Sequence, residues 1–151
     1  GTTFCLTFPA IAITPTPSSP DASAPARGTE TILLVEDQFE VRLLARALLI
    51  RQGYHVLEAA SGEEALALAA SCQDRISLLV TDVIMPGCTG PELARRFSET
   101  RPGIPILFMS GYDAGSLAPD AAHIAKPFTP NAFVNRIRQL IDAAPPQVNG
   151  R

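Results

Sequence analysis

The stretch "LLVTDVIMPG", residues 78–87, decides the fold expected for this chain. An uninterrupted apolar run is typical of a strand buried on both faces of a parallel sheet, and the Pro86-Gly87 pair ends that run. The single carboxylate, Asp82, therefore falls at the carboxyl end of a central strand. Sites in open α/β sheets are built at that edge, which makes Asp82 the first candidate site residue.

Apolar strands alternate with helical patterns on both sides of this segment, which predicts β-α-β units and a parallel sheet. The expected strands cover residues 31–36, 54–59, 76–81 and 104–110, with a fifth directly before Lys126. The segment 54–59 alternates between apolar and polar residues, so we expect it at the edge of the sheet.

The expected helices begin at hydroxyl residues that can accept a backbone hydrogen bond: Ser61, Thr89 and Thr129. In the first helix an i, i+3, i+4, i+7 spacing predicts a core-facing stripe, made of Val41, Leu44, Ala45 and Leu48.

Length and composition predict one globular domain, because the 151 residues are 46% hydrophobic and 18% charged. Twelve basic and fifteen acidic residues form no Lys/Arg cluster, so nucleic-acid binding is not expected. Three widely spaced cysteines favour a reducing, cytoplasmic setting. No apolar run approaches the roughly 18 residues that a membrane span needs, so no membrane contact by this fragment is expected.

Three acidic residues are expected to share one pocket at the carboxyl edge of the sheet. Glu36 and Asp37 follow the first strand, and Asp82 ends the third. Two carboxylates about 5 Å apart repel by roughly 3 kcal/mol at an effective dielectric near 20, so the cluster needs a cation. Oxygen ligands of this kind suit Mg²⁺, which also accepts phosphate oxygens.

A hydroxyl and an ammonium group can reach the same edge. Ser110 ends the fourth strand, and Lys126 follows the fifth. Phosphoryl transfer needs in-line positioning and charge neutralisation, so this set of residues suits a reaction in which Asp82 is the nucleophile and forms an aspartyl phosphate.

Four motifs in register carry a family resemblance: "LLVED", "LLVTDVIMPG", "FMSGY" and "KPF". In that order, on those strand ends, they resemble the receiver domain of two-component response regulators over about residues 30–143. The resemblance implies a flavodoxin-like (CheY-like), doubly wound, five-stranded parallel sheet. It also implies that Asp82 takes a phosphoryl group from a phosphohistidine in a Mg²⁺-dependent reaction and that the domain then switches conformation.

The resemblance assigns the remaining roles residue by residue. Asp37, Asp82 and the backbone carbonyl of Ile84 would hold Mg²⁺, while Glu36 would act through water. Ser110 would bond the phosphoryl group as the switch hydroxyl, and Lys126 would pair with its oxygens. The partner would be a histidine kinase or a histidine phosphotransfer protein. Pro127 is expected to hold the Lys126 loop in one conformation.

The N-terminal residues resemble a different family. "GTTFCLTFP" is similar to the closing strand of the ATP-binding domain of sensor histidine kinases. The implied organisation is the C-terminal piece of a hybrid histidine kinase, whose parent chain could be membrane-anchored. Its segments are a remnant strand (1–13), a flexible linker (14–29), the receiver (30–143) and a tail (144–151).

Two features depart from the receiver pattern. The position three residues before Lys126, which usually carries an aromatic switch residue, is His123. The sequence leaves open whether His123 or Tyr112 replaces that residue, whether His123 is a half-buried residue without a role, and whether Tyr112 only covers the pocket. Only 16 residues separate Ser110 from Lys126, which predicts a shortened fourth helix. In the receiver family the face that carries this helix commonly mediates dimerisation or output, so the sequence leaves open whether the chain forms a homodimer.

Several alternatives stay open from the sequence. A pseudo-receiver that acts as an interaction module without phosphorylation is the main one. A haloacid-dehalogenase-type phosphatase would need an acid where Ile84 stands. Asp37 alone reads as a helix N-cap, and Glu36 as a solvated loop acid.

The fragment would catalyse only its own phosphorylation and dephosphorylation. Ile84 has no polar side chain to orient water, which predicts a long-lived aspartyl phosphate.

Overall fold

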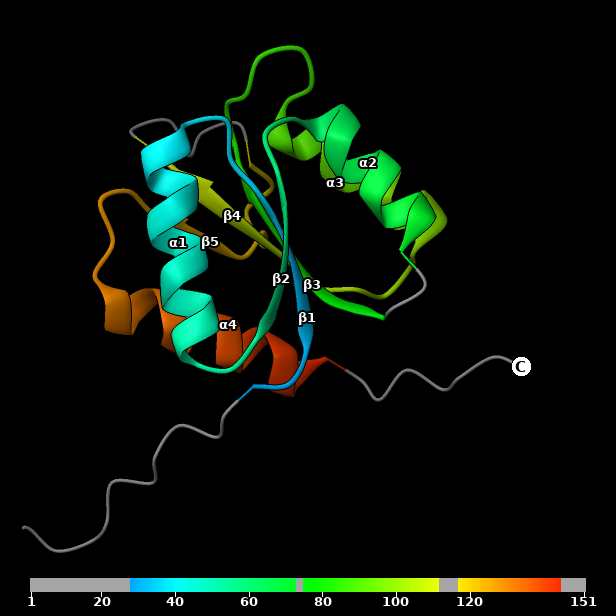
Figure 1. Ribbon diagram of the computed structural model, residues 1–151. Helices are drawn as coiled ribbons and strands as arrows, with labels where there is room; N and C mark the ends of the chain where they lie inside the picture. Colours follow the sequence, from blue (N-terminus) through cyan, green and yellow to red (C-terminus); the bar gives the residue numbers. More distant parts are fainter. Residues whose placement is uncertain (1–27, 73–74, 112–116, 145–151) are drawn as a thin grey trace, which may run out of the picture.

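The computed structural model describes residues 28–72, 75–111 and 117–144. The proposed kinase remnant, most of the linker, Tyr112 and all of the tail except Ala144 lie outside these residues. The chain folds as a five-stranded parallel sheet in the order β2-β1-β3-β4-β5 (Figure 1). Its strands are β1 (Thr31–Val35), β2 (His55–Ala59), β3 (Ile76–Asp82), β4 (Ile106–Ser110) and β5 (His123–Ala125).

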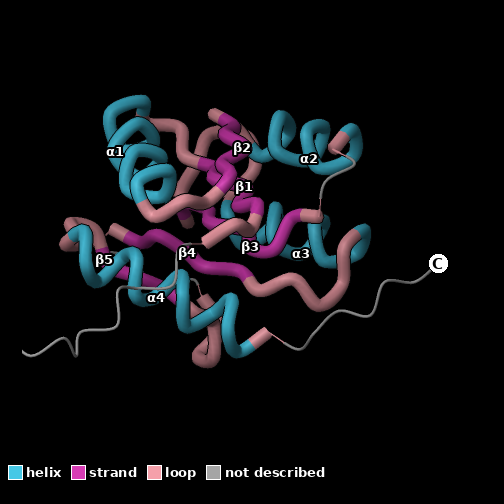
Figure 2. Tube along the Cα trace, turned by 60° about the horizontal axis from the view of Figure 1, so that its bottom comes forward, coloured by secondary structure: helices cyan, strands magenta, loops and turns pink. Residues whose placement is uncertain are grey.

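In the described part of the chain, four helices cover the two faces of the sheet. They are α1 (Phe39–Arg51), α2 (Gly62–Ser71), α3 (Gly90–Thr100) and α4 (Pro130–Ala143). One face packs on α1 and α4, and the other on α2 and α3 (Figure 2). Alternate residues of β1 serve the two layers, with Ile32 facing the first and Leu33 the second. The flavodoxin-like fold expected from the sequence is confirmed.

The predicted helix starts are confirmed. The hydroxyl oxygens of Ser61, Thr89 and Thr129 each accept the backbone N–H of the residue three positions later. Strand β2 lies at one edge of the sheet, as its alternating pattern indicated. Local sequence chemistry therefore decided where these helices begin.

The predicted stripe of α1 is wrong in part. Leu44 is 53% exposed, whereas Ala45 and Leu49 are fully buried. The helix is apolar over much of its circumference, with Leu43 and Ile50 also exposed. Its apolar spacing therefore fits more than one rotation, and packing against β1 and β2 selects a different one from the rotation we expected.

The segment between β4 and β5 contains no helix within its described residues, 111 and 117–122. Gly28 and Thr29, which we placed in the linker, belong to the described fold: Gly28 is buried against Tyr54, and its N–H donates to the Gln52 carbonyl at 3.0 Å. Within the three described ranges, no helix is long and apolar enough to cross a membrane.

Candidate functional site

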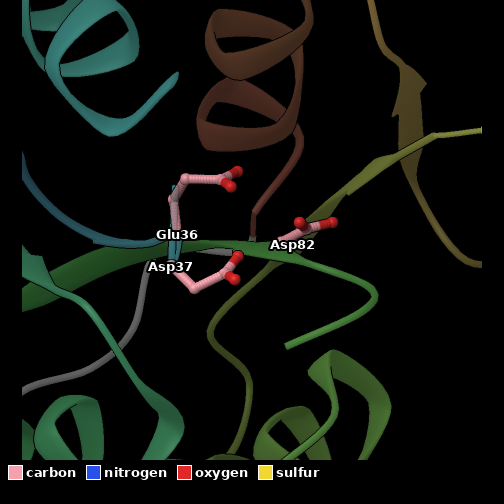
Figure 3. A group of neighbouring side chains, drawn as sticks. All are labelled: Glu36, Asp37 and Asp82. Carbon is pink, nitrogen blue, oxygen red and sulfur yellow. The ribbon is translucent and has the colours of Figure 1, made fainter. Parts of the chain in front are cut away.

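The register of the sheet brings the three predicted acids together. Val35 pairs with Thr81, so the residues that follow β1 lie beside Asp82 at the end of β3. Carboxylate oxygens of Glu36, Asp37 and Asp82 lie within 4.8 Å of one another (Figure 3). The expectation of one shared acidic pocket is met.

Lys126 reaches this cluster from the end of β5. Its backbone N–H donates to the Ser110 carbonyl at 2.6 Å, which holds it against the neighbouring strand. Its ammonium Nζ donates to Glu36 Oε2 at 2.7 Å and to Asp82 Oδ2 at 2.9 Å. The peptide bond between Lys126 and Pro127 is cis. The predicted lysine is therefore in direct contact with the predicted phosphoacceptor.

Glu36 differs from the solvated loop acid that we considered. It is fully buried, Oε2 accepts from Lys126, and Oε1 accepts from the Gln38 N–H at 3.3 Å. Burial raises the pKa of Glu36 above its ordinary value, and the hydrogen bond from Lys126 only partly opposes this. For Lys126, burial lowers the pKa, but its bonds to Glu36 and Asp82 outweigh burial and leave the pKa raised.

Two buried polar atoms of the site, Asp37 Oδ1 and Ser110 Oγ, lack a hydrogen-bond partner among the described residues. An unpaired carboxylate oxygen beside two other acids fits a cation ligand. Three ionised carboxylates and one ammonium leave two net negative charges, which one divalent cation would neutralise. The residues present thus fit a divalent cation in an all-oxygen site.

The acids open into a hollow at the carboxyl edge of the sheet. Its lining consists of Asp37, Gln38, Asp82, Ile84, Met85, Pro86, Gly111 and Lys126. Ile84 is 64% exposed at the rim, and its N–H lies 3.5 Å from Asp82 Oδ1. Met85 and Cys88 are buried in the core beside the site.

Asp37 does not cap α1, contrary to its simplest interpretation. The N-cap is Gln38, whose side chain makes no capping hydrogen bond. His123 is exposed and its Nδ1 lies 3.2 Å from the carbonyl of Ala121, in its own segment. None of the described contacts joins His123 to the acids.

Sequence reasoning missed two residues beside the site. Arg42, from the first turns of α1, donates from Nη1 to the Glu36 carbonyl at 2.6 Å. Gly90 begins α3 so close to β3 that a Cβ there would lie 2.1 Å from the Asp82 carbonyl oxygen. The "TGPE" run signalled a helix start but not this close approach, which depends on a contact between separate elements.

Comparison with known proteins places the chain in a family. The family described as "Response regulator receiver domain" matches residues 32–138. The response regulator receiver protein CpdR of Brucella abortus is 38% identical over 119 residues, which cover 75% of this chain and 98% of CpdR. The sensor kinase CckA of the same organism is 36% identical over 121 residues, but the matched part is 76% of this chain and only 13% of CckA.

Solved structures agree with this assignment. The crystal structure of the receiver domain from the hybrid histidine kinase CckA has 40% sequence identity and a TM-score of 0.65, and the match covers 74% of this chain and 98% of that one. A receiver protein from Sinorhizobium medicae has 30% identity, a TM-score of 0.69, and coverage of 76% and 96%. The chain belongs to the response regulator receiver domain family of two-component signal transduction, whose partners are histidine kinases or phosphotransfer proteins.

Proposed function

We propose that Asp82 accepts a phosphoryl group from a phosphohistidine and that Mg²⁺ is the divalent cation of the site. Asp37, Asp82 and the backbone carbonyl of Ile84 would hold the ion, with Glu36 acting through water. The ion would neutralise charge on the transferring phosphoryl oxygens. The proposal rests on one observation: three carboxylates lie within 4.8 Å of one another, and two of them, Glu36 and Asp82, contact the Lys126 ammonium.

The proposed step moves the phosphoryl group from the phosphohistidine of the partner protein to Asp82. A carboxylate oxygen of Asp82 attacks phosphorus, the P–O bond forms as the P–N bond of the phosphohistidine breaks, and the electron pair returns to the imidazole nitrogen. Lys126, already 2.9 Å from Asp82 Oδ2, offers its charge to the phosphoryl oxygens. The Ser110 hydroxyl, buried and unpaired among the described residues, is free to donate to another of these oxygens and so to couple phosphorylation to a conformational switch.

We also propose that the domain comes from a hybrid histidine kinase and works in the cytoplasm. The resemblance of residues 1–13 to a kinase strand supports this origin, and so does the similarity to the CckA receiver domain. Ile84, an exposed apolar side chain that lines the hollow beside Asp82, is suited to contact the donor protein.

Intact-mass spectrometry after incubation with Mg²⁺ and acetyl phosphate tests the proposed chemistry. We expect one phosphate adduct, which is absent in Asp82→Asn and absent without Mg²⁺. A folded protein that forms no adduct, beside a known receiver that does, would favour the pseudo-receiver alternative. An adduct that persists in Asp82→Asn would place the phosphoacceptor elsewhere.

A further inference from the structure

We propose that Arg42 is a positioning residue that fixes the acidic loop, Glu36 and Asp37, for cation binding. This inference rests on the proposed divalent-cation site and adds a residue that contacts neither cation nor phosphate. Arg42 Nη1 lies 2.6 Å from the Glu36 carbonyl oxygen and 3.5 Å from that of Asp37. One guanidinium therefore ties together the backbone of the two adjacent acids.

Helix α1 has no side-chain cap that would help to hold the acidic loop. Helix α1 begins at Phe39, and the side chain of its N-cap, Gln38, makes no capping hydrogen bond, unlike the N-caps of α2, α3 and α4. The Gln38 N–H is instead bonded by Glu36 Oε1, so an acid of the site also serves the helix start. The Glu36 N–H donates to the Ala59 carbonyl at 3.2 Å, and Arg42 adds the contacts that join the carbonyl oxygens of Glu36 and Asp37. Loss of Arg42 would therefore loosen the peptide that carries the Asp37 carboxylate.

A neighbouring aromatic ring holds the guanidinium in place. The Cζ atom of Arg42 lies 5.6 Å from the centre of the Phe39 ring, within the range of a cation–π contact. Phe39 is 60% exposed, so burial does not account for an aromatic residue at this position. The contact with the ring instead limits the rotamers available to Arg42.

The direction in which Mg²⁺ affinity changes on loss of Arg42 distinguishes a positioning role from a purely electrostatic one. A positive side chain next to the acids repels a divalent cation, so removing its charge alone would tighten Mg²⁺ binding. Loss of a positioning bond would weaken Mg²⁺ binding, because the carboxylates would have to be ordered again when the ion binds. A purely structural role would lower the melting temperature of the metal-free protein and leave Mg²⁺ affinity unchanged.

The experiment titrates the full chain with Mg²⁺ alone by isothermal titration calorimetry, since the chain has no tryptophan to report binding. Arg42→Gln is compared with Arg46→Gln, one turn later on α1. Arg46 pairs with Glu58 at 3.3 Å, and both side chains are more than 40% exposed. The two variants lose the same charge from the same helix, but only the first loses the bond to the acidic loop.

We expect Arg42→Gln to weaken Mg²⁺ binding by roughly tenfold and Arg46→Gln to leave it unchanged or slightly tighter. Arg42→Lys keeps the charge and can donate to one carbonyl, so its affinity should lie between wild type and Arg42→Gln. Equal or tighter binding by Arg42→Gln would overturn the inference, as would a loss of the same size in Arg46→Gln.

Two controls keep this inference separate from the proposed function. Asp37→Asn should lose Mg²⁺ binding altogether, and wild type without any Mg²⁺ binding would refute the cation site itself. If Arg42→Gln fails to fold in the metal-free state, Phe39→Leu tests the same tie more gently, with an expected weakening of about two- to fivefold. Unchanged Mg²⁺ affinity in Phe39→Leu and in Arg42→Lys would then count against positioning.

Discussion

At each end of strand β1, one basic side chain contacts two carboxylates, but the two clusters differ in how deeply their side chains are buried. At the carboxyl end, Lys126 contacts Glu36 and Asp82, with side-chain exposures of 18%, 0% and 8%. At the amino end, Arg138 contacts Glu30 and Asp142, with exposures of 22%, 26% and 61%. A third acid, Asp37, adds to the first cluster.

The pKa shifts of the acids differ in direction between the two clusters. Burial raises the pKa of Glu36 despite its bond from Lys126. The hydrogen bond from Arg138 lowers the pKa of Asp142, which lies in solvent. Burial therefore makes the ionised form of Glu36 costly at the carboxyl end, whereas Arg138 stabilises the ionised form of the exposed Asp142 at the amino end. Of the two clusters, only the one at the carboxyl end, with its buried acids, suits a divalent metal ion and a phosphoryl group.

Replacing the basic side chain of each cluster should give the largest difference between the clusters in the free energy of unfolding. Lys126→Met leaves two buried carboxylates without their partner, so we expect the free energy of unfolding in EDTA to fall by about 3 kcal/mol. Arg138→Met breaks more exposed pairs and should cost about 1 kcal/mol or less. Urea denaturation measures both values, and equal losses would remove the distinction between the clusters.

Neutralising one acid should have opposite signs at the two ends. Asp37→Asn relieves repulsion in the acidic cluster, so the metal-free protein should gain about 1 to 2 kcal/mol. Glu30→Gln weakens a pair with Arg138 and should lose up to about 1 kcal/mol. Thermal unfolding with and without Mg²⁺ checks this, because Asp37→Asn should also lose any stabilisation by the ion. A destabilised Asp37→Asn would show that the cluster carries no excess charge.

The third prediction concerns the lifetime of the aspartyl phosphate, which only the cluster at the carboxyl end is expected to form. Ile84 at its rim has no group to orient an attacking water. Ile84→Asn adds an amide that can bond one, so loss of the phosphoryl group from Asp82 should become about two- to tenfold faster. Mass spectrometry over time follows this loss, with Ile84→Leu as the matched control. A rate no faster than wild type would count against the prediction that Ile84 prolongs the life of the aspartyl phosphate.

The smallest expected effect is a pH dependence. Because the pKa of Glu36 is raised in the folded state, that state binds more protons than the unfolded chain between pH 4.5 and the raised value. The contribution of Glu36 is therefore present below pH 4.5 and lost as the pH rises through its folded pKa. In EDTA, Glu36→Gln should gain stability relative to wild type over this window. A difference that does not change with pH would contradict the raised pKa.

Much of the site could be predicted because strand ends are local features. Apolar runs that end in Asp37, Asp82, Ser110 and Lys126 place these residues at one edge once the sheet is parallel. The state of Glu36 could not be predicted, since its burial and its bond to Lys126 join residues 90 positions apart. The rotation of α1 was also ambiguous, because an apolar helix does not specify one buried stripe.

The amino-acid sequence by itself determined the alternation of strands and helices and the starts of α2, α3 and α4, because hydrophobic period and capping act over a few residues. The resemblance of four short motifs at strand ends indicated the family. The tertiary structure alone decided which charges are buried together, how Lys126 is shared between Glu36 and Asp82, and the approach of Arg42 and Gly90 to the acidic edge. These features depend on distances between separate elements, and electrostatic energies depend on those distances and on the exclusion of water.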